Sequence, residues 1–133
     1  MICLVKPSIS VLLLSYNHEK YIERAVKSVF EQAKYGFDME LIIIDDGSTD
    51  RTPFILRKLE SESPITMRVF FNQHEGVTSI SKNFQKLITL SSKKYLSFLA
   101  SDDEFMPDRF ADQVEILERN PNLKLVYSNG VNV

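Results

Sequence analysis

The sequence predicts an α/β domain in which a mainly parallel sheet carries helices on both faces. Short apolar runs of β-type composition alternate with segments whose apolar residues recur at helical spacing, from one end of the chain to the other. The apolar runs are nearly continuous, as is typical of strands that are covered on both faces. With 133 residues, 44% of them apolar and 26% charged, residues 1–133 are expected to form a single domain with a sizeable core.

The first half of the chain predicts two strands and two helices. Residues 9–14 are the first apolar run, and residues 22–30 carry apolar side chains at helical spacing, with Asn17 available as the helix cap. Residues 39–44 predict a second buried strand. Pro53 then lies in the first turn of a second helix, where its missing N–H leaves no hydrogen bond unmade.

The second half repeats this alternation and adds one more strand. Residues 67–71 and 95–100 predict the third and fourth strands, with a helical pattern between them. A fourth helix is predicted to start at Pro107 and to end before Asn120-Pro121, and residues 123–127 predict a fifth strand. Right-handed crossovers then place the carboxyl end of every strand on one edge of the sheet.

The overall composition excludes several classes of protein. A net charge of −2 and a pI near 5.7 give no support for a nucleic-acid surface, which needs clustered Lys and Arg. A single cysteine, Cys3, excludes an internal disulfide framework, and we interpret it as a small apolar residue near the start of a strand. No apolar run approaches the roughly 18 residues of a membrane span, and the start has no signal-peptide pattern. The expected location is cytoplasmic, with any membrane association provided by sequence outside this chain.

Acidic pairs follow the second and fourth predicted strands, on the same edge of the sheet. They are Asp45-Asp46 and Asp102-Asp103, and Ser15-Tyr16-Asn17 follows the first strand. Open α/β sheets bind ligands at the carboxyl ends of the strands, where the strand order reverses. Adjacent carboxylates repel each other unless a cation compensates, and a hard divalent cation prefers oxygen ligands and keeps places for phosphate oxygens. Because the chain also lacks a Gly-rich phosphate loop, the pattern favours a site for a metal-bridged diphosphate.

The same segments also have a structural interpretation that requires no ligand. Residues 46–50, Asp-Gly-Ser-Thr-Asp, have favourable turn and cap chemistry, and one such segment alone indicates a turn more often than a site. Ser101-Asp102-Asp103, ahead of a helix that starts at a proline, could cap that helix and complement its dipole. The occurrence of two acidic pairs on one edge favours the metal site over two unrelated turns.

Three longer segments, taken together, resemble one family of enzymes. They are residues 10–17 (Ser-Val-Leu-Leu-Leu-Ser-Tyr-Asn), 41–50 (Leu-Ile-Ile-Ile-Asp-Asp-Gly-Ser-Thr-Asp) and 98–109 (Phe-Leu-Ala-Ser-Asp-Asp-Glu-Phe-Met-Pro-Asp-Arg). In order and spacing they are similar to the family-2 glycosyltransferases of the GT-A fold, and the resemblance covers nearly the whole chain. It implies a Rossmann-like sheet of GT-A type, truncated here to the N-terminal, nucleotide-sugar-binding part of a longer domain.

The resemblance implies a role for each residue that matches the family's motifs. Tyr16 would stack on the nucleotide base, with Ser15 and Asn17 shaping the loop around it. Asp46 would accept a hydrogen bond from the base, as matching aspartates do from N3–H of uracil, and Asp102 would lie near the ribose or the diphosphate. A UDP-sugar is therefore the expected donor.

Two further positions concern the charge of the diphosphate. By resemblance, Asp103 would be the direct ligand of Mn²⁺ or Mg²⁺, which would neutralise charge on the leaving diphosphate. Lys82 stands in the pair Lys82-Asn83, where the family often has Arg-Asn, and it keeps the positive charge but loses the bidentate geometry of arginine. Ser101 stands where many relatives have a first aspartate, while the metal position at Asp103 is retained.

The sequence offers no candidate for the general base that an inverting transferase needs to deprotonate the acceptor hydroxyl. By resemblance that carboxylate is expected beyond Val133, and His18 and His74 are interpreted as solvent-exposed structural residues of loops. The acceptor, whether a glycan, a lipid-linked glycan or a protein, is not indicated. The alternative is a non-catalytic module that binds a nucleotide sugar or a partner protein on a retained fold, and a carboxylate in a downstream acceptor domain would favour the enzyme.

Overall fold

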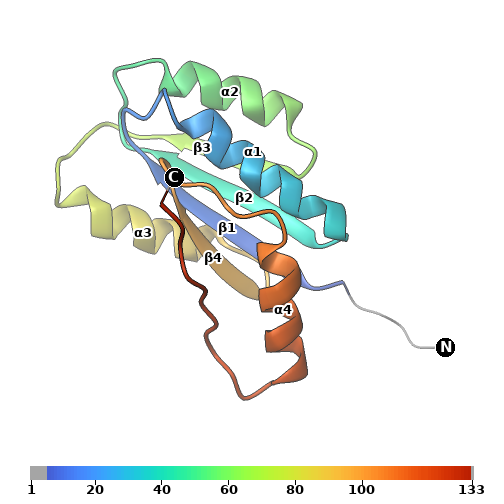
Figure 1. Cartoon of the computed structure of the whole chain (residues 1–133). Coiled ribbons are helices and arrows are strands. Elements are labelled where there is room, and N and C mark those ends of the chain that lie inside the picture. Colours follow the sequence, from blue (N-terminus) through green and yellow to red (C-terminus); the bar gives the residue numbers. More distant parts are fainter. Residues whose placement is uncertain (1–5, 133) are drawn as a thin grey trace.

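The computed structural model describes residues 6–132, and these residues form a four-stranded parallel sheet with helices on both faces (Figure 1). The spatial order is β3-β2-β1-β4, and every neighbouring pair is parallel. The predicted α/β class and the first four predicted strands are confirmed. Cys3, which we interpreted as a residue near a strand start, lies outside the described residues. The strands are β1 (Ser8–Ser15), β2 (Asp38–Asp45), β3 (Thr66–Phe71) and β4 (Tyr95–Ala100).

Four α-helices and one short 3-10 helix connect and follow the strands. Helices α1, α2 and α4 pack on one face of the sheet, and α3 packs on the other. The single helix on the second face is the crossover that carries the chain from β3, past β2 and β1, to β4. The helices are α1 (Ile22–Gln32), η1 (Ala33–Tyr35), α2 (Thr52–Glu62), α3 (Ser79–Leu90) and α4 (Arg109–Arg119).

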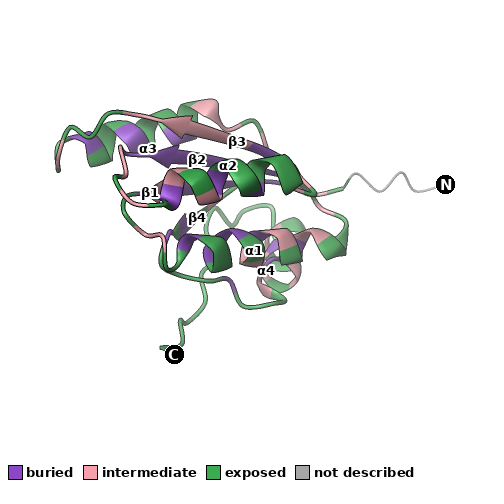
Figure 2. Ribbon diagram, turned by 90° about the horizontal axis from the view of Figure 1, so that it is seen from above, coloured by how far each residue is buried: buried purple, intermediate pink, exposed green. Residues whose placement is uncertain are grey.

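Strand β1 shows why its sequence is almost continuously apolar. Val11 and Leu13 point into the core formed with α1, α2 and α4, whereas Leu12 points to the opposite face and packs near Leu87 of α3. All four side chains are fully buried, and Figure 2 shows the buried residues concentrated in the strands and on the inner sides of the helices. Each such side chain contributes about 1.5–3 kcal/mol relative to exposure. Burial on both faces therefore explains the run without alternation.

The register of the strands brings their carboxyl ends to a common rim. In the register of the sheet, Ser15 of β1 is paired with Asp45 of β2, and Asp45 is paired with Phe71 of β3. On the other side of β1, Leu14 is paired with Ala100 of β4. The loops that follow β1, β2, β3 and β4 consequently leave the sheet from the same edge. The strand order reverses between β1 and β4, which is where open α/β sheets bind ligands.

The predicted fifth strand at residues 123–127 is wrong, because the described residues contain four strands and this segment is irregular. The segment lines a groove of about 490 Å³ together with β4 and α4. It does not extend the sheet (Figure 1). Leu125 and Tyr127 are 76% and 83% exposed. β-type composition produces a strand only where the backbone pairs with a neighbouring strand and another layer covers the side chains, whereas this segment pairs with no described strand and is largely exposed.

Two predicted helix starts also need correction. Asn17 does not cap α1, because the chain first makes a turn in which His18 O accepts hydrogen bonds from the backbone N–H groups of Tyr21 and Ile22, at 3.0 and 2.9 Å. Pro107 precedes α4 instead of starting it, since it lies in a turn that leads to Arg109. Pro53 lies in the first turn of α2, as predicted. None of the helices within residues 6–132 is long and apolar enough to cross a membrane.

At the end of the sheet opposite the rim, a buried carboxylate on β2 accepts hydrogen bonds from β1 and from the segment that precedes β4. Glu40 on β2 is 4% exposed and accepts hydrogen bonds from Ser10 Oγ at 2.6 Å and from Ser92 N and Oγ at 2.7 and 3.0 Å. Arg68 Nη2 lies 3.6 Å from the same carboxylate. Burial by itself raises the pKa of Glu40, but the hydrogen bonds from Ser10 and Ser92 and the charge of Arg68 outweigh it and hold the pKa below its usual range.

This arrangement predicts how stability depends on pH. Because the folded pKa of Glu40 lies below that of an unfolded glutamate, about 4.3, the unfolded chain binds more protons in acid and the contribution of Glu40 is lost as pH falls through its folded pKa. Urea unfolding of wild type and Glu40→Gln between about pH 3 and pH 7 measures this effect. We expect a stability difference that is largest near neutral pH and shrinks in acid. A stability difference between wild type and Glu40→Gln that stays constant with pH would contradict this prediction. Glu62→Gln, at an exposed position, serves as the control.

Candidate functional site on the carboxyl rim

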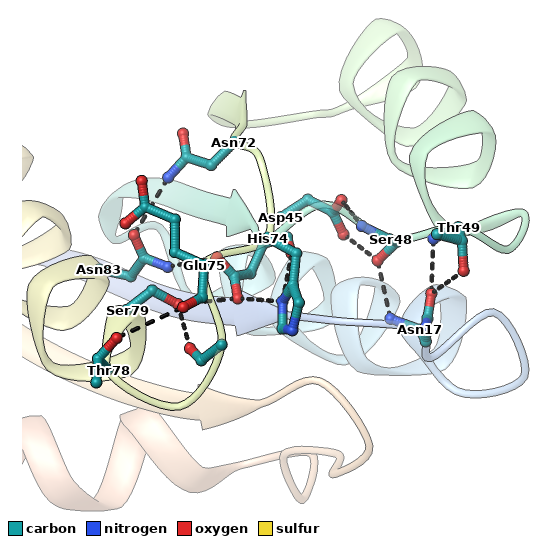
Figure 3. A network of polar contacts seen from close by, with 12 residues as sticks. Asn17, Asp45, Ser48, Thr49, Asn72, His74, Glu75, Thr78, Ser79 and Asn83 are labelled. Atoms are coloured by element: carbon teal, nitrogen blue, oxygen red, sulfur yellow. Dashed lines mark hydrogen bonds and ion pairs between the residues drawn. The ribbon is translucent and has the colours of Figure 1, made fainter.

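Hydrogen bonds from Asn17 join the loops that follow β1 and β2. Its side-chain oxygen accepts from the backbone N–H of Thr49 at 2.8 Å, and its own N–H donates to Ser48 Oγ at 2.8 Å. The backbone of Asn17 has φ +50°, a left-handed conformation that asparagine tolerates better than most residues. Figure 3 shows the link between Asn17, Ser48 and Thr49. Asn17 therefore holds the loops after β1 and β2 together.

At the end of β2 and in the β2–α2 loop, two aspartates accept hydrogen bonds from nearby backbone N–H groups. Asp45 is 1% exposed, and its carboxylate accepts from Ser48 N at 2.9 Å and Ser48 Oγ at 2.6 Å. Asp50 accepts from Thr52 N at 2.8 Å, at the start of α2, and from Glu19 N at 3.1 Å. Burial raises the pKa of Asp50, but these hydrogen bonds and that of the Thr52 hydroxyl hold it below its usual range.

Asp46 lies at the centre of a second polar cluster, between β2 and α3. Its carboxylate is buried, with 5% of the residue exposed, and it accepts hydrogen bonds from three side chains. His74 Nδ1 lies 2.9 Å from Oδ2, Ser79 Oγ lies 3.1 Å from Oδ2, and Asn83 Nδ2 lies 3.0 Å from Oδ1. A carboxylate offers about four lone-pair positions. One position therefore remains for a further donor.

The aromatic ring of Tyr16 stacks on the ring of His74. The ring centroids are 4.3 Å apart and the planes are inclined by only 10°. Tyr16 is 40% exposed, so part of its surface stays accessible on the rim. His74 thus contacts both Tyr16 and Asp46, the two residues that the resemblance assigns to the nucleotide base.

The loop after β4 presents the second acidic pair to solvent. Ser101 is 2% exposed and its hydroxyl lies 2.5 Å from His18 Nδ1, which ties this loop to the one after β1. The following residues, Asp102 and Asp103, are exposed, and within residues 6–132 their side chains make no hydrogen bond or ion pair. Asp103 N donates to Ala100 O at 3.1 Å and closes the turn. Neither carboxylate is used as a helix cap, which leaves both available to a ligand.

The donor set fits a divalent cation that is shared with a ligand. In the described part of the chain no group of three or more His, Cys, Asp or Glu side chains could hold a metal by itself. Two adjacent free carboxylates can supply one or two oxygen ligands to Mg²⁺ or Mn²⁺, which usually takes its other ligands from waters and substrate phosphates. The chemistry of the pair therefore matches a metal-bridged diphosphate better than a closed metal centre.

The structure places the remaining predicted residues around these groups. Ser15 is 1% exposed at the end of β1, and within the described residues its hydroxyl has no hydrogen-bond partner. Lys82 is exposed on α3, next to the buried Asn83 that bonds to Asp46. Within residues 6–132 no hydrogen bond or ion pair joins Lys82 or the acidic pair to Asp46. The site is thus made of two parts, the Tyr16–Asp46 part and the acidic pair, on the loops that flank β1.

Sequence reasoning did not assign three side chains that the fold brings to this site. His74 is exposed, as expected, but it contacts Tyr16 and Asp46, and His18 is half-buried against Ser101. Ser79 contributes a hydroxyl to Asp46 from the first turn of α3. Single loop residues of this kind give no periodic or spaced signal, and only their contacts reveal them.

A parallel sheet with this order and with polar loops gathered on its carboxyl rim defines a Rossmann-like α/β domain of GT-A type. A model of the family described as "Glycosyl transferase family 2" matches residues 10–130, nearly the whole chain. The chain belongs to this family. TuaG of Bacillus subtilis, a glycosyltransferase assigned to teichuronic acid biosynthesis, is 35% identical over 112 residues, which are 84% of this chain and 42% of TuaG.

Solved structures support the same fold. Residues 1–349 of S. aureus TarS, in complex with UDP-GlcNAc, superpose with a TM-score of 0.74 at 24% identity, over 95% of this chain and 37% of that one. The mannosyltransferase PcManGT from Pyrobaculum calidifontis, in complex with GDP-Man and Mn²⁺, gives 0.72 at 18% identity, over 85% and 33%. The chain therefore spans less than half the length of these proteins.

Proposed function

We propose that this chain supplies the donor-binding part of an inverting, metal-dependent glycosyltransferase, which transfers a sugar from a nucleotide-diphosphate sugar, a UDP-sugar, to an acceptor hydroxyl. The observation that carries the proposal is the free Asp102–Asp103 pair on the same rim as Tyr16 and Asp46, in a member of glycosyl transferase family 2. The bound UDP-GlcNAc of TarS and the GDP-Man and Mn²⁺ of PcManGT support a donor of this chemical class.

In this proposal the Tyr16 loop and Asp46 bind the nucleoside. The exposed ring of Tyr16 stacks on the base, and the carboxylate of Asp46 accepts a hydrogen bond from it. Asn17 keeps the loop in place through Ser48 and Thr49, and the strand end at Ser15 forms the floor. Uracil suits Asp46 because its N3–H is a donor, which a carboxylate requires.

The acidic pair and Lys82 act on the diphosphate. Asp103 holds the divalent cation, Mn²⁺ or Mg²⁺, and Asp102 lies near the ribose or the diphosphate. When bound, the ion neutralises the charge that develops on the leaving diphosphate, an effect worth several kcal/mol. Lys82 on α3 adds a positive charge, without the bidentate geometry of arginine.

The acceptor hydroxyl needs a general base that we expect in the remainder of a longer protein. Relatives such as TuaG extend well beyond the matched length, which leaves room for an acceptor-binding part. The acceptor would be a glycan, a lipid-linked glycan or a protein, for example in polysaccharide biosynthesis. A cytoplasmic location, with membrane association through other sequence, stays a prediction.

Calorimetric titration of UDP in the presence and absence of Mn²⁺ tests the proposed metal site. We expect binding that requires the metal and weakens at least tenfold, about 1.4 kcal/mol, in Asp103→Ala. Asp112→Ala, which removes another exposed aspartate from the first turn of α4, is the matched control and should bind as wild type does. UDP binding that is independent of the metal, or unaffected by Asp103→Ala, would refute the assignment.

A further inference from the structure

The position of His74 has a consequence for nucleotide binding that rests on the proposed function. A nucleobase bound as proposed would make two contacts, a parallel stack on Tyr16 and an N–H hydrogen bond to Asp46. The imidazole of His74 makes both: its ring lies 4.3 Å from the ring of Tyr16 at 10°, and its Nδ1 lies 2.9 Å from Asp46 Oδ2. An ionised carboxylate only accepts hydrogen bonds, so Nδ1 carries the proton in this contact.

We propose that the His74 ring stands in the position of the nucleobase and rotates away when the nucleotide binds, so that His74 sets the affinity of the site. A centroid separation of 4.3 Å leaves no space for another ring between the two, because stacked aromatic rings themselves lie at this distance. A base that stacks on this face of Tyr16 while it bonds to Asp46 must therefore replace the imidazole.

The surroundings of His74 allow its side chain to move while its backbone stays in place. The side chain is 42% exposed and lies in a loop whose neighbours Gln73 and Glu75 are also exposed. The backbone of His74 packs closely on Gly47, where a Cβ would lie 2.5 Å from His74 N. Rotation about side-chain bonds of a surface residue is fast and leaves the core intact. The exchange therefore needs no rearrangement of the sheet.

The carboxylate of Asp46 keeps three hydrogen-bond donors in this exchange, whether the imidazole or the base is present. Ser79 and Asn83 keep their hydrogen bonds to the carboxylate, and the third donor is either the imidazole or the base. The buried carboxylate is thus never left short of a donor, which would be costly at 5% exposure. The same exchange selects against a base that presents only acceptors toward Asp46.

The expected effect on affinity follows from the fraction of molecules in which the ring has moved. The apparent dissociation constant equals the intrinsic one divided by the fraction that is competent to bind. If the stacked position is occupied in about nine molecules of ten, removal of the ring strengthens binding roughly tenfold. His74→Phe keeps a ring that stacks on Tyr16 but has no donor for Asp46, so its affinity should lie between those of wild type and His74→Ala.

UDP titration of these variants in the presence of Mn²⁺ tests the inference. We expect tighter binding in His74→Ala, and no change in Gln73→Ala, the exposed neighbour that serves as the control. Unchanged or weaker binding in His74→Ala would overturn the inference, because the imidazole would then have no effect on nucleotide binding or would contribute to it. The proposed function would stand in either case. Failure of wild type and all variants to bind UDP or GDP would instead refute the proposed function itself.

Proton NMR of the imidazole gives a second readout that does not depend on affinity. In wild type the ring protons of His74 should be shifted upfield by the ring current of Tyr16, and Tyr16→Leu should abolish the shift. Saturating UDP should also abolish it, because the ring has left the stack. A shift that persists in the UDP complex would show that the base binds elsewhere on Tyr16, and would overturn the inference.

Discussion

Gly47→Ala is expected to destabilise the protein by about 2–4 kcal/mol, through a combination of backbone strain and a steric clash. Gly47 has φ +78°, in the left-handed region where a Cβ is disfavoured by about 1–2 kcal/mol. A Cβ would also lie 2.5 Å from His74 N and 3.2 Å from Asn72 O, both of which are backbone atoms. Backbone cannot rotate away as a side chain can, so the β2–α2 loop and the β3–α3 loop must separate.

Gly36→Ala provides the matched control for this prediction. Gly36 has the same φ of +78°, but a Cβ there would meet no atom within 4 Å. Its cost should be the conformational term alone, about 1–2 kcal/mol. Urea unfolding of both variants therefore isolates the contact between the two loops, and equal losses of stability would contradict the steric argument.

The same substitution should also weaken nucleotide binding, because Gly47 follows Asp46 and contacts His74. Separation of the loops displaces the carboxylate from the donors of α3, Ser79 and Asn83. UDP binding measured well below the unfolding transition distinguishes this local effect from loss of fold. Gly36, at the end of η1, is remote from the rim and should leave binding unchanged.

Gln32→Glu is expected to cost about 3–5 kcal/mol at neutral pH, although the two side chains have nearly the same shape. Gln32 is fully buried at the end of α1, where its amide nitrogen donates to Met106 O at 3.0 Å and Pro107 O at 3.4 Å. Its oxygen accepts from Phe110 N at 3.1 Å. The variant would replace the donor by a carboxylate oxygen, which faces two carbonyl oxygens without a compensating cation.

The pH dependence of this variant has the opposite sign to that of Glu40. Burial and the carbonyl oxygens favour the neutral form of the new carboxyl, so its folded pKa lies above the unfolded value and the folded chain binds more protons. Stability relative to wild type should therefore recover as pH falls and the carboxyl regains a donor. Gln85→Glu, on the exposed side of α3, is the control and should change stability by less than about 0.5 kcal/mol. Unfolding of Gln32→Glu at the wild-type midpoint would contradict the prediction.

The strands were predictable because each is covered on both faces. Burial of Leu12 and Leu13 on opposite sides of β1 requires apolar residues at successive positions, and this pattern is visible without coordinates. The β-type composition of residues 123–127 was misleading, since that segment pairs with no described strand and leaves most of its side chains exposed. Both segments have β-type composition, and pairing with a neighbouring strand makes the difference.

The candidate site was predictable to the level of its acidic motifs. Their position after strands two and four follows from the chain order, and parallel connections bring them to one rim. The separate fates of adjacent aspartates were not predictable: Asp45 bonds within its own loop, Asp46 bonds to α3, and Asp102 and Asp103 stay free. Asn17 could likewise have capped α1 or bonded to a neighbouring loop. The packing of the loops selected the hydrogen bond with Thr49.

The sequence by itself determined the α/β class, the first four strands, the helical segments and the family, since these depend on periodicity and on motifs with fixed spacing. Only the tertiary structure decided the strand order, the rejection of the fifth strand and the polar contacts of the rim. His74 stacks on Tyr16, 58 positions earlier in the numbering, only because β1 and the loop after β3 end at the same edge. Contacts between loops depend on the register of strands that are distant in sequence, and no local pattern encodes that register.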